Sequence, residues 1–205
     1  MVLACYSDYF EEKYLIKTDY HQSISITDMD EEMVNKLIEF IYTKNIDINN
    51  ENVMSLLFTS NKLKIKYAKD FCLEYLKSSI SANDCFFILN VANQYKEESL
   101  KVKVYEFICN NFNDVVQNIG FQNITKPDLL SCISVLKRNE MSEMQIYDAL
   151  ITWTKHDEQN RKLDFPDLFQ LLDLDQFSKD YLLDVVAEEI LVKENPVCYR
   201  MVKKN

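Results

Sequence analysis

Glycine and proline are scarce in this sequence, which has one glycine, Gly120, and three prolines among its 205 residues. Phosphate-binding loops, nucleophile elbows and tight hairpins need glycine, because the backbone there adopts positive φ or approaches a ligand closely. The chain therefore has almost nothing from which to build a Rossmann or P-loop nucleotide site, and it cannot contain a Gly-x-Ser-x-Gly hydrolase motif. The scarcity favours a protein of helices joined by polar turns.

Histidine is almost as scarce, with only His21 and His156 in the chain. Neither histidine belongs to an HExxH motif or to a Cys/His set with zinc-ligand spacing. Adjacent carboxylate pairs such as Glu11-Glu12 are poor catalytic candidates, because neighbours on a helix diverge by about 100°. We therefore predict no catalytic residue, no metal site and no cofactor. An unrelated helical enzyme that uses His156 or a glutamate pair is the alternative hypothesis.

Positive charge is also in deficit, since the formal net charge is −10 and the sequence pI is about 4.8. This net charge would repel a phosphate backbone. No cluster of lysine and arginine interleaved with aromatic residues offsets the repulsion. We predict that the protein does not bind nucleic acid.

The six cysteines come without a Cys-x-x-Cys pair, a signal peptide or a long apolar run. This pattern is typical of reduced core thiols in a cytoplasmic protein, with the nucleus as a second possible compartment, and we expect no membrane association. A redox-sensing thiol is the alternative for any one of them. The cysteines are Cys5, Cys72, Cys85, Cys109, Cys132 and Cys198.

Hydrophobic residues, at 47%, and aromatic residues, at 12%, are abundant. This composition is that of a folded protein. Apolar residues recur at helical spacing along nearly the whole chain, whereas residues 24–26 and 46–48 alternate like short strands. The expected fold class is therefore mainly α with a small residual β element.

Local signals predict where individual helices begin. Asp28, with Glu31 three positions later, is a predicted helix N-cap, and the apolar face that follows ends near Tyr42. Ser142 opens a capping box for a helix that carries Trp153, the only tryptophan, as a core anchor or alternatively as a stacking surface for a ligand. Further helices are expected over 52–60, 63–78, 83–95, 100–116 and 142–156, and from Thr125, Phe165, Ser178 and Asn195 onward.

The segment 78–82 is the nearest feature to a domain boundary, because it separates a mixed first third of the chain from a wholly helical remainder. No fixed repeat period runs through the helices, so a regular helical solenoid is less favoured. The expected domains are residues 1–79 and 80–205.

Several segments of the first domain resemble the BTB/POZ domain of kelch-like proteins. The run from Val2 to Phe10 resembles the family's LAACSxYF helix, and residues 40–43 resemble its FxYTG hallmark. Residues 48–53 and 71–76 follow in the family's order. The resemblance implies a partial BTB/POZ fold, because the family's N-terminal helix and first strands have no counterpart before Val2.

The second domain resembles the BACK domain of the same family. Residues 83–85 and 92–95 resemble its opening. The most specific match fixes several residue types over one helix and its exit: Ser142, Glu143, Ile146, Tyr147, Ala149, Trp153, Asp157 and Arg161. The whole chain thus resembles the BTB-BACK region of a kelch-like protein, N-terminally truncated and without kelch repeats, and its BACK domain is expected to be all-helical.

The resemblance implies a non-enzymatic protein-interaction adaptor, like the substrate adaptors of cullin-3 ubiquitin ligases. Two of the residues that would face cullin-3 have alternative, structural roles. Asp28 could be a simple helix N-cap, and Tyr42 could be an aromatic residue at the edge of the core. The candidate cullin-3-facing residues are Asp28, Met29, Tyr42, Thr43, Asn61 and Lys62.

Two departures from the family pattern bear on cullin-3 binding. Lys44 replaces the usual glycine after Thr43, and residues 18–21 do not match the family's hydrophobic-x-Glu contact. A few buried apolar anchors usually carry such an interface, so these departures would weaken it. The alternative function is a BTB-type scaffold or competitor that pairs with other BTB proteins, or with itself, without recruiting a ligase. The missing N-terminal helix argues against self-pairing.

Overall fold

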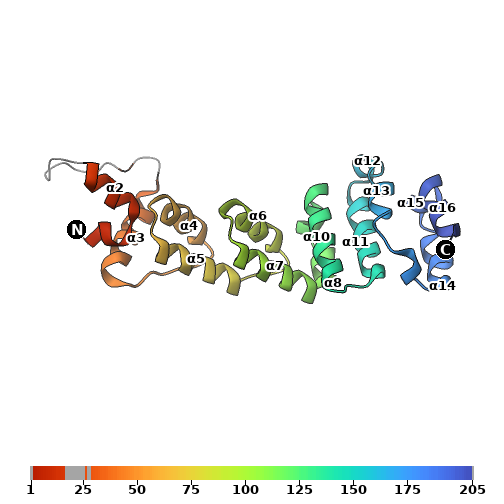
Figure 1. Ribbon diagram of the computed structural model, residues 1–205, viewed down its shortest axis with the longest axis horizontal. Helices are drawn as coiled ribbons and strands as arrows, with labels where there is room; N and C mark the ends of the chain where they lie inside the picture. The colour runs from red at the N-terminus through yellow and green to blue at the C-terminus, as the bar shows by residue number, and fades with distance from the viewer. Residues whose placement is uncertain (1, 17–25, 27–28, 205) are drawn as a thin grey trace. The chain divides into compact units, whose positions relative to one another are not determined.

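The computed structural model describes residues 2–16, 26 and 29–204, and the chain divides into two compact units, Met1–Ile80 and Ser81–Asn205 (Figure 1). Helices and irregular segments make up the described ranges, and no β-strand occurs within them. The expectation of a mainly α fold is confirmed.

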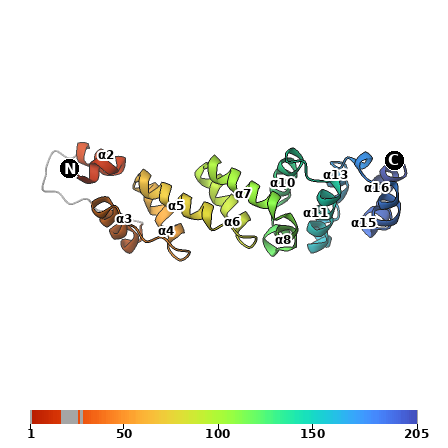
Figure 2. The same ribbon diagram turned by 90° about the horizontal axis from the view of Figure 1, so that it is seen from below.

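The first unit contains a helical hairpin, in which α4 (Val53–Lys62) and α5 (Lys66–Ser78) pack against each other and lie side by side in both ribbon views (Figures 1 and 2). The turn between them is closed by a hydrogen bond of 2.8 Å from the N–H of Ile65 to the carbonyl of Ser60. The buried Ser7 hydroxyl donates to the carbonyl of Leu63 and so links the N-terminal helices to this turn. The helices of this unit are α1 (Val2–Tyr6), α2 (Asp8–Ile16), α3 (Glu31–Thr43), α4 (Val53–Lys62) and α5 (Lys66–Ser78).

The N-cap of α3 is two residues later than predicted. The Oδ1 atom of Asp30 accepts hydrogen bonds from the backbone N–H groups of Glu32 (2.8 Å) and Met33 (3.3 Å). An aspartate directly before the first helical residue satisfies N–H groups that the helix leaves unpaired and interacts favourably with the helix dipole. The N-cap prediction for Asp28 is therefore wrong: Asp30 fills that role, and Asp28 lies outside the described residues.

The two segments expected to alternate like strands have different outcomes. Ile24 and Ser25 lie outside the described residues, whereas 46–48 is described and forms no regular structure. The side chain of the buried Asn52 binds the backbone in and just after this second segment: its Nδ2 donates to the carbonyl of Asp47 (2.9 Å) and its Oδ1 accepts from the N–H of Asn49 (2.9 Å). The carbonyl of Asp47 thus has a hydrogen-bond partner without a neighbouring strand.

The second unit is a succession of helices in the described residues 81–204. The single helix predicted over 100–116 is wrong, because the chain breaks at Asn111 into α7 and α8, and the Asn111 side chain donates to the carbonyl of Phe107 (2.9 Å). Such local side-chain bonds compete with the helical hydrogen bonds. The elements are α6 (Cys85–Tyr95), α7 (Glu98–Asn110), α8 (Phe112–Gln117), α9 (Ile119–Gln122), α10 (Lys126–Arg138), α11 (Glu143–His156), α12 (Glu158–Arg161), α13 (Phe165–Phe169), η1 (Leu174–Gln176), α14 (Lys179–Tyr181), η2 (Leu182–Val186), α15 (Ile190–Lys193) and α16 (Pro196–Lys204).

Helix α11 begins at the predicted capping box, and its tryptophan lies in the core as predicted. Ser142 and Gln145 form the expected capping box. Trp153 is 2% exposed and its Nε1 donates to the carbonyl of Ile124 (2.9 Å), so the core-anchor prediction is confirmed. The guanidinium of Arg161 lies 4.1 Å from the centroid of the Trp153 ring and donates to the carbonyls of Trp153 (2.6 Å) and Gln122 (2.7 Å). Ser142, Trp153 and Arg161 belong to the string of residues that resembles the BACK domain. Ser142 starts α11, and the contacts between Trp153 and Arg161 hold its C-terminal end.

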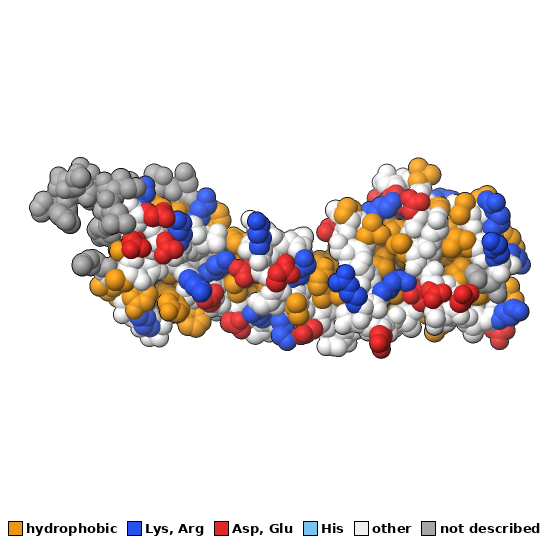
Figure 3. Space-filling view, viewed as in Figure 1, with side chains coloured by type: hydrophobic (Ala, Val, Ile, Leu, Met, Phe, Trp, Pro, Cys, Tyr) orange, Lys and Arg blue, Asp and Glu red, His pale blue; other side chains and the backbone are white. Residues whose placement is uncertain are grey.

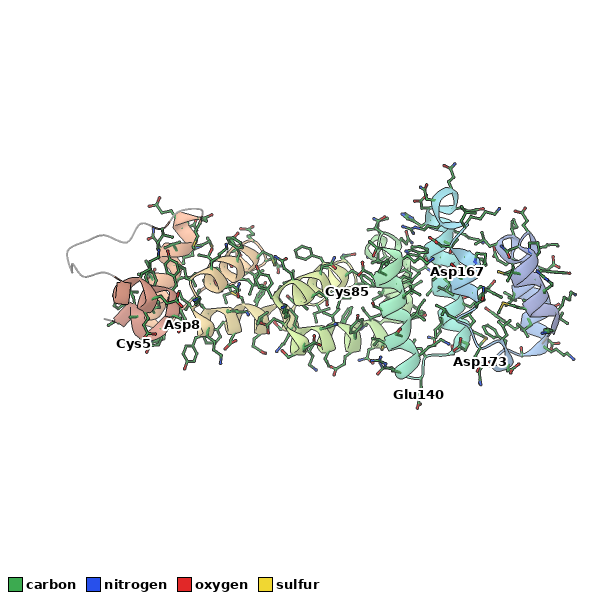
Figure 4. The ribbon with its side chains drawn as sticks, turned by 45° about the horizontal axis from the view of Figure 1, so that its top comes forward. Cys5, Asp8, Cys85, Glu140, Asp167 and Asp173 are labelled. Atoms are coloured by element: carbon green, nitrogen blue, oxygen red, sulfur yellow. The ribbon has the colours of Figure 1, made fainter. Side chains whose placement is uncertain are left out.

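Residues other than glycine occupy the left-handed positions of the described chain. Positive φ angles occur at Lys44 (63°), Lys64 (51°), Lys96 (56°) and Glu140 (57°), which follow helices α3, α4, α6 and α10. Glu140 is labelled in Figure 4. Gly120 has no positive φ; a Cβ there would lie 3.3 Å from Oδ1 of Asn118, so its role is close packing. The chain forms helix-ending turns without the residue that normally favours them.

Candidate protein-binding surface

A groove of about 610 Å³ lies between the start of α3 and the middle of α4 in the first unit. Its apolar walls come from methionine and phenylalanine side chains. Methionine is flexible and polarisable, so it adapts to irregular partner surfaces. The groove is lined by Met29, Asp30, Met54, Ser55, Phe58 and Thr59.

The amphipathic pattern of α4 explains why it lines a groove. Val53, Leu56 and Leu57 are buried and hold the helix on the core. Met54 and Phe58 are four residues apart and therefore share one helical face, which is distinct from the buried one. Phe58 is 42% exposed and lines the groove together with Met54 and Met29, so it belongs to an apolar cluster and is not a single exposed residue.

The structure brings only part of the predicted surface together. Met29 lines the groove, and Asn61 and Lys62 are exposed at the end of α4. The ammonium of Lys62 lies 5.6 Å from the centroid of the Phe58 ring, so a cation borders the apolar wall.

The other predicted residues lie apart from the groove. Tyr42 and Thr43 end α3, at the opposite end of a 13-residue helix from Asp30, which is a separation of about 20 Å at 1.5 Å per residue. Tyr42 is 60% exposed, and the Thr43 hydroxyl donates to the carbonyl of Glu39 (2.9 Å). Asp28 and the segment 18–21 lie outside the described residues.

Phe58, Met54 and Asp30 line the groove but were not predicted from the sequence to do so. A usable signal was present, because Met54 and Phe58 fall outside the apolar face formed by Val53, Leu56 and Leu57. Large apolar residues outside the buried face of a helix are candidates for a binding surface. Their relation to Met29 depends on tertiary packing and carries no local signal.

Lys44, which stands where the family has glycine, adopts the left-handed conformation that glycine would favour. Its backbone N–H donates to the carbonyl of Phe40 (2.8 Å) and ends α3. Its Nζ donates to the carbonyl of Ile41 (2.6 Å) and lies 3.3 Å from the centroid of the Tyr6 ring. These contacts offset the strain of about 1 kcal/mol that a side chain incurs in this conformation.

The cysteines are free thiols, but not all are core residues as predicted. Cys72, Cys85, Cys132 and Cys198 are buried, whereas Cys5 is exposed; Figure 4 labels Cys5 on α1 and Cys85 at the start of α6. Cys109 is partly exposed, so the core prediction is wrong for Cys5 and incomplete for Cys109. Cys5 is exposed because it lies on α1, which has no buried residue.

Burial determines the protonation of the core thiols. It raises the pKa of Cys72, Cys85 and Cys132 to about 12. A thiolate is the reactive form of cysteine, so these three thiols stay protonated and unreactive at neutral pH.

His156 is exposed, and its Nε2 lies 3.2 Å from Oδ1 of Asn123. His21 lies outside the described residues. Among the residues that the structure describes, no group of three or more His, Cys, Asp or Glu side chains is placed to hold a metal ion. No helix in the same ranges is long and apolar enough to cross a membrane.

Comparison with protein-family models identifies the two units. Residues 85–187 match the BACK model (BTB And C-terminal Kelch), and residues 1–80 match the BTB/POZ domain model. The BACK match alone covers half of the chain. The chain therefore belongs to the BTB-BACK family.

Kelch-like proteins are similar along nearly the whole chain. Kelch-like protein 7 of Homo sapiens is 29% identical over 204 residues, which are 98% of this chain and 35% of the relative. Kelch-like protein 17 of Homo sapiens is 28% identical over 200 residues, 97% and 31% respectively. Kelch-like protein 41 of Mus musculus is 23% identical over 205 residues, 99% and 34%. The chain spans about a third of the length of these relatives, and its resemblance to the kelch-like BTB-BACK region is confirmed.

Proposed function

We propose that this chain is a non-enzymatic adaptor that binds the N-terminal region of cullin-3 through the groove between α3 and α4. The groove carries the proposal, because it joins a predicted contact residue, Met29, to two apolar side chains that the fold leaves accessible, Met54 and Phe58. Interfaces of this kind depend on a few aromatic and apolar anchors that become fully desolvated.

Membership of a family of kelch-like protein-interaction modules supports the adaptor role. The free cysteines, with one of them exposed, support a location in the cytoplasm or nucleus, where thiols remain reduced. The net charge of −10 supports a protein partner over nucleic acid.

A scaffold or competitor that pairs with other BTB proteins is the second candidate. It is favoured by the position of Tyr42 and Thr43, which lie one helix length from Met29 and do not extend the groove. In that case Tyr42 and its neighbours would contact another BTB chain, and the groove would not hold a cullin.

Isothermal titration with the purified cullin-3 N-terminal region tests the proposal. Phe58→Asp should weaken binding roughly thirtyfold or more, because it places a charge on the apolar wall. The matched control is Phe87→Asp, which alters another exposed phenylalanine, in the second unit, and should leave binding within about twofold. Circular dichroism checks that both variants are folded.

Absence of binding by the folded wild-type protein would reject the cullin-3 proposal. If the same sample co-purifies with a tagged BTB protein in a separate pull-down, the scaffold is favoured. Equal losses for Phe58→Asp and Phe87→Asp would show that the groove is not the contact.

A further inference from the structure

A hollow of about 300 Å³, here called the α6–α10 hollow, lies in the second unit between α6 and the start of α10. In Figure 3 the upper outline of this unit dips between these two helices. Apolar side chains line the hollow together with the side chains of three asparagines, Asn83, Asn90 and Asn123. Apolar walls with a few polar groups are typical of a binding site.

The apolar walls are largely ordered by the core of the unit. Phe86 is 6% exposed, and its ring lies 5.8 Å from the ring of the buried Phe121, centroid to centroid. Leu89 and Ile124 are buried as well, whereas Phe87 is 55% exposed. A ligand side chain in the hollow would therefore meet walls that are already fixed and would remove the Phe87 ring from water.

Two of the three carboxamides are held in place by neighbouring side chains. Oδ1 of Asn83 accepts a hydrogen bond from Nδ2 of Asn118, and Oδ1 of Asn123 lies 3.2 Å from Nε2 of His156. Within the described residues, the Nδ2 groups of Asn83 and Asn123 have no partner, and the Asn90 side chain makes no hydrogen bond. The hollow therefore offers two oriented donors, and at Asn90 both a donor and an acceptor.

Gly120, the only glycine of the chain, also lines the hollow. Its N–H donates to Oδ1 of Asn118 (2.9 Å), and a Cβ in its place would lie 3.3 Å from that oxygen. Glycine thus leaves room for Asn118, which in turn holds the carboxamide of Asn83.

The charges around the hollow argue against an anionic ligand. Among the residues that the structure describes, Asp128 is the one charged residue that lines it, and its Oδ2 accepts from the Thr125 hydroxyl (2.6 Å). The neighbouring Lys126 forms an ion pair with Asp164 (2.7 Å). Carboxylate and phosphate groups are usually bound by arginine or lysine, so the donors at this hollow suit neutral acceptors such as peptide carbonyls.

The form of the ligand follows from the same groups. A carboxamide can donate to a peptide carbonyl and accept from a peptide N–H. A helix pairs these backbone groups internally except in its end turns, whereas an extended segment leaves them available and turns alternate side chains to opposite sides. Main-chain hydrogen bonds combined with a pocket for one side chain are a recurring mode of peptide recognition.

We propose that the α6–α10 hollow binds an extended, uncharged segment of a partner protein. One apolar side chain of the segment enters the hollow and covers Phe87, and the peptide groups beside it pair with Asn90 and Asn123. The hollow shares no residue with the groove between α3 and α4, so this site is independent of cullin-3 binding.

A library of labelled heptapeptides with acetylated and amidated ends provides the probe, because blocked ends carry no charge. Each pool has one fixed residue at the centre and mixtures of alanine, serine and threonine elsewhere. Fluorescence anisotropy with the full chain should show roughly tenfold tighter binding for the leucine or methionine pool than for the alanine or glutamate pool. N-methylation of the central peptide group should weaken the tightest peptide roughly tenfold, because it removes one main-chain donor and keeps the side chain.

Asn90→Ala should weaken binding of that peptide roughly fivefold or more. Asn93→Ala is the matched control, because Asn93 is an exposed asparagine of the same helix that does not line the hollow, and it should stay within about twofold. Phe87→Ala should weaken binding roughly tenfold. Phe58→Ala should leave it unchanged, which separates this site from the cullin-3 groove. Circular dichroism checks that every variant is folded.

Failure of the folded wild-type chain to bind any pool overturns the proposal, as does an equal loss in Asn90→Ala and Asn93→Ala. Unchanged affinity after N-methylation would reject main-chain pairing, and tightest binding of the glutamate pool would assign an anionic ligand instead. A dimer of the wild-type chain in sedimentation, lost in Phe87→Ala, would assign the hollow to a second copy and reject the proposed segment.

Discussion

Two sets of aromatic side chains, one in each unit, differ in how far the fold buries them. In the second unit Trp153 is 2% exposed, hydrogen-bonded to Ile124 and stacked under Arg161. In the first unit Tyr67 and Phe71 are at least half exposed. The second unit therefore packs its largest ring into its own core, whereas the first unit leaves these two rings accessible to solvent.

The largest effect should come from Trp153→Ala, which tests the stabilising side of this contrast. The substitution removes the largest core side chain and leaves the Ile124 carbonyl without its donor. It should lower the free energy of unfolding by about 3–5 kcal/mol. Urea unfolding followed by circular dichroism measures the change. Trp153→Phe should recover part of the loss, and a loss below about 1 kcal/mol in the alanine variant would contradict the anchor role.

Phe40→Ala and Phe71→Ala compare a buried ring with an exposed ring in the first unit, where the two rings contact each other. Phe40 is 3% exposed, so its removal should cost about 3–5 kcal/mol. Phe71 is 50% exposed, so its removal should cost about 1 kcal/mol or less. Unfolding by urea, followed by circular dichroism, compares the two variants.

Trp153 is the only tryptophan, so its fluorescence reports the second unit alone and serves as an internal control. Phe40→Ala should shift the circular dichroism transition and leave the fluorescence transition in place. Equal shifts in both signals would show that the two units unfold together.

The buried thiols predict how stability changes at alkaline pH in both units. Burial raises the pKa of Cys72 in the first unit, and of Cys85 and Cys132 in the second, to about 12, from 9.0. The unfolded chain therefore loses these protons first. The stabilising contribution is complete below about pH 9 and is lost as the pH rises toward 12.

Urea midpoints measured between about pH 8 and pH 10.5 should fall, and Cys132→Ala should show a shallower fall. Thiol labelling of the native protein should modify exposed Cys5 first. Rapid labelling of Cys72, Cys85 or Cys132 under native conditions would contradict this protection.

The smallest effect is a gain in stability from Lys96→Gly. Lys96 is exposed and has φ of 56° after α6, a conformation that glycine adopts without strain. The variant should be about 0.5–1 kcal/mol more stable. Lys44→Gly should gain less, because it also loses the contacts with Tyr6 and Ile41. Thermal unfolding measures both variants, and destabilisation by Lys96→Gly would show that the turn depends on its lysine side chain.

Local chemistry made the helices of the second unit predictable. Ser142 with Gln145 and Thr125 before Pro127 are capping patterns that act within one turn, and both open helices where expected. The break at Asn111 was not predictable in the same way, because the apolar pattern continues across it and a side-chain hydrogen bond decides the outcome. The N-cap of α3 was also not predictable, because either Asp28 or Asp30 could cap a helix that begins nearby; the structure has Asp30 in that role.

The candidate site was less predictable than the fold. Resemblance to the family selected Met29, Asn61 and Lys62, which lie at or near the groove, and also Tyr42 and Thr43, which lie at the far end of α3. Sequence spacing places residues on a helix but does not show which helices meet. The exposure of Phe58 and Phe71 is likewise a result of packing between helices.

The left-handed turns at Lys44, Lys64, Lys96 and Glu140 have a consequence for the order of folding. An isolated chain rarely visits this conformation at a residue with a side chain, so such a turn does not act as a nucleus. We expect the helices on each side to form and dock before the turn between them is fixed. Folding rates should therefore respond more to substitutions in the helix contacts than to substitutions in the turns.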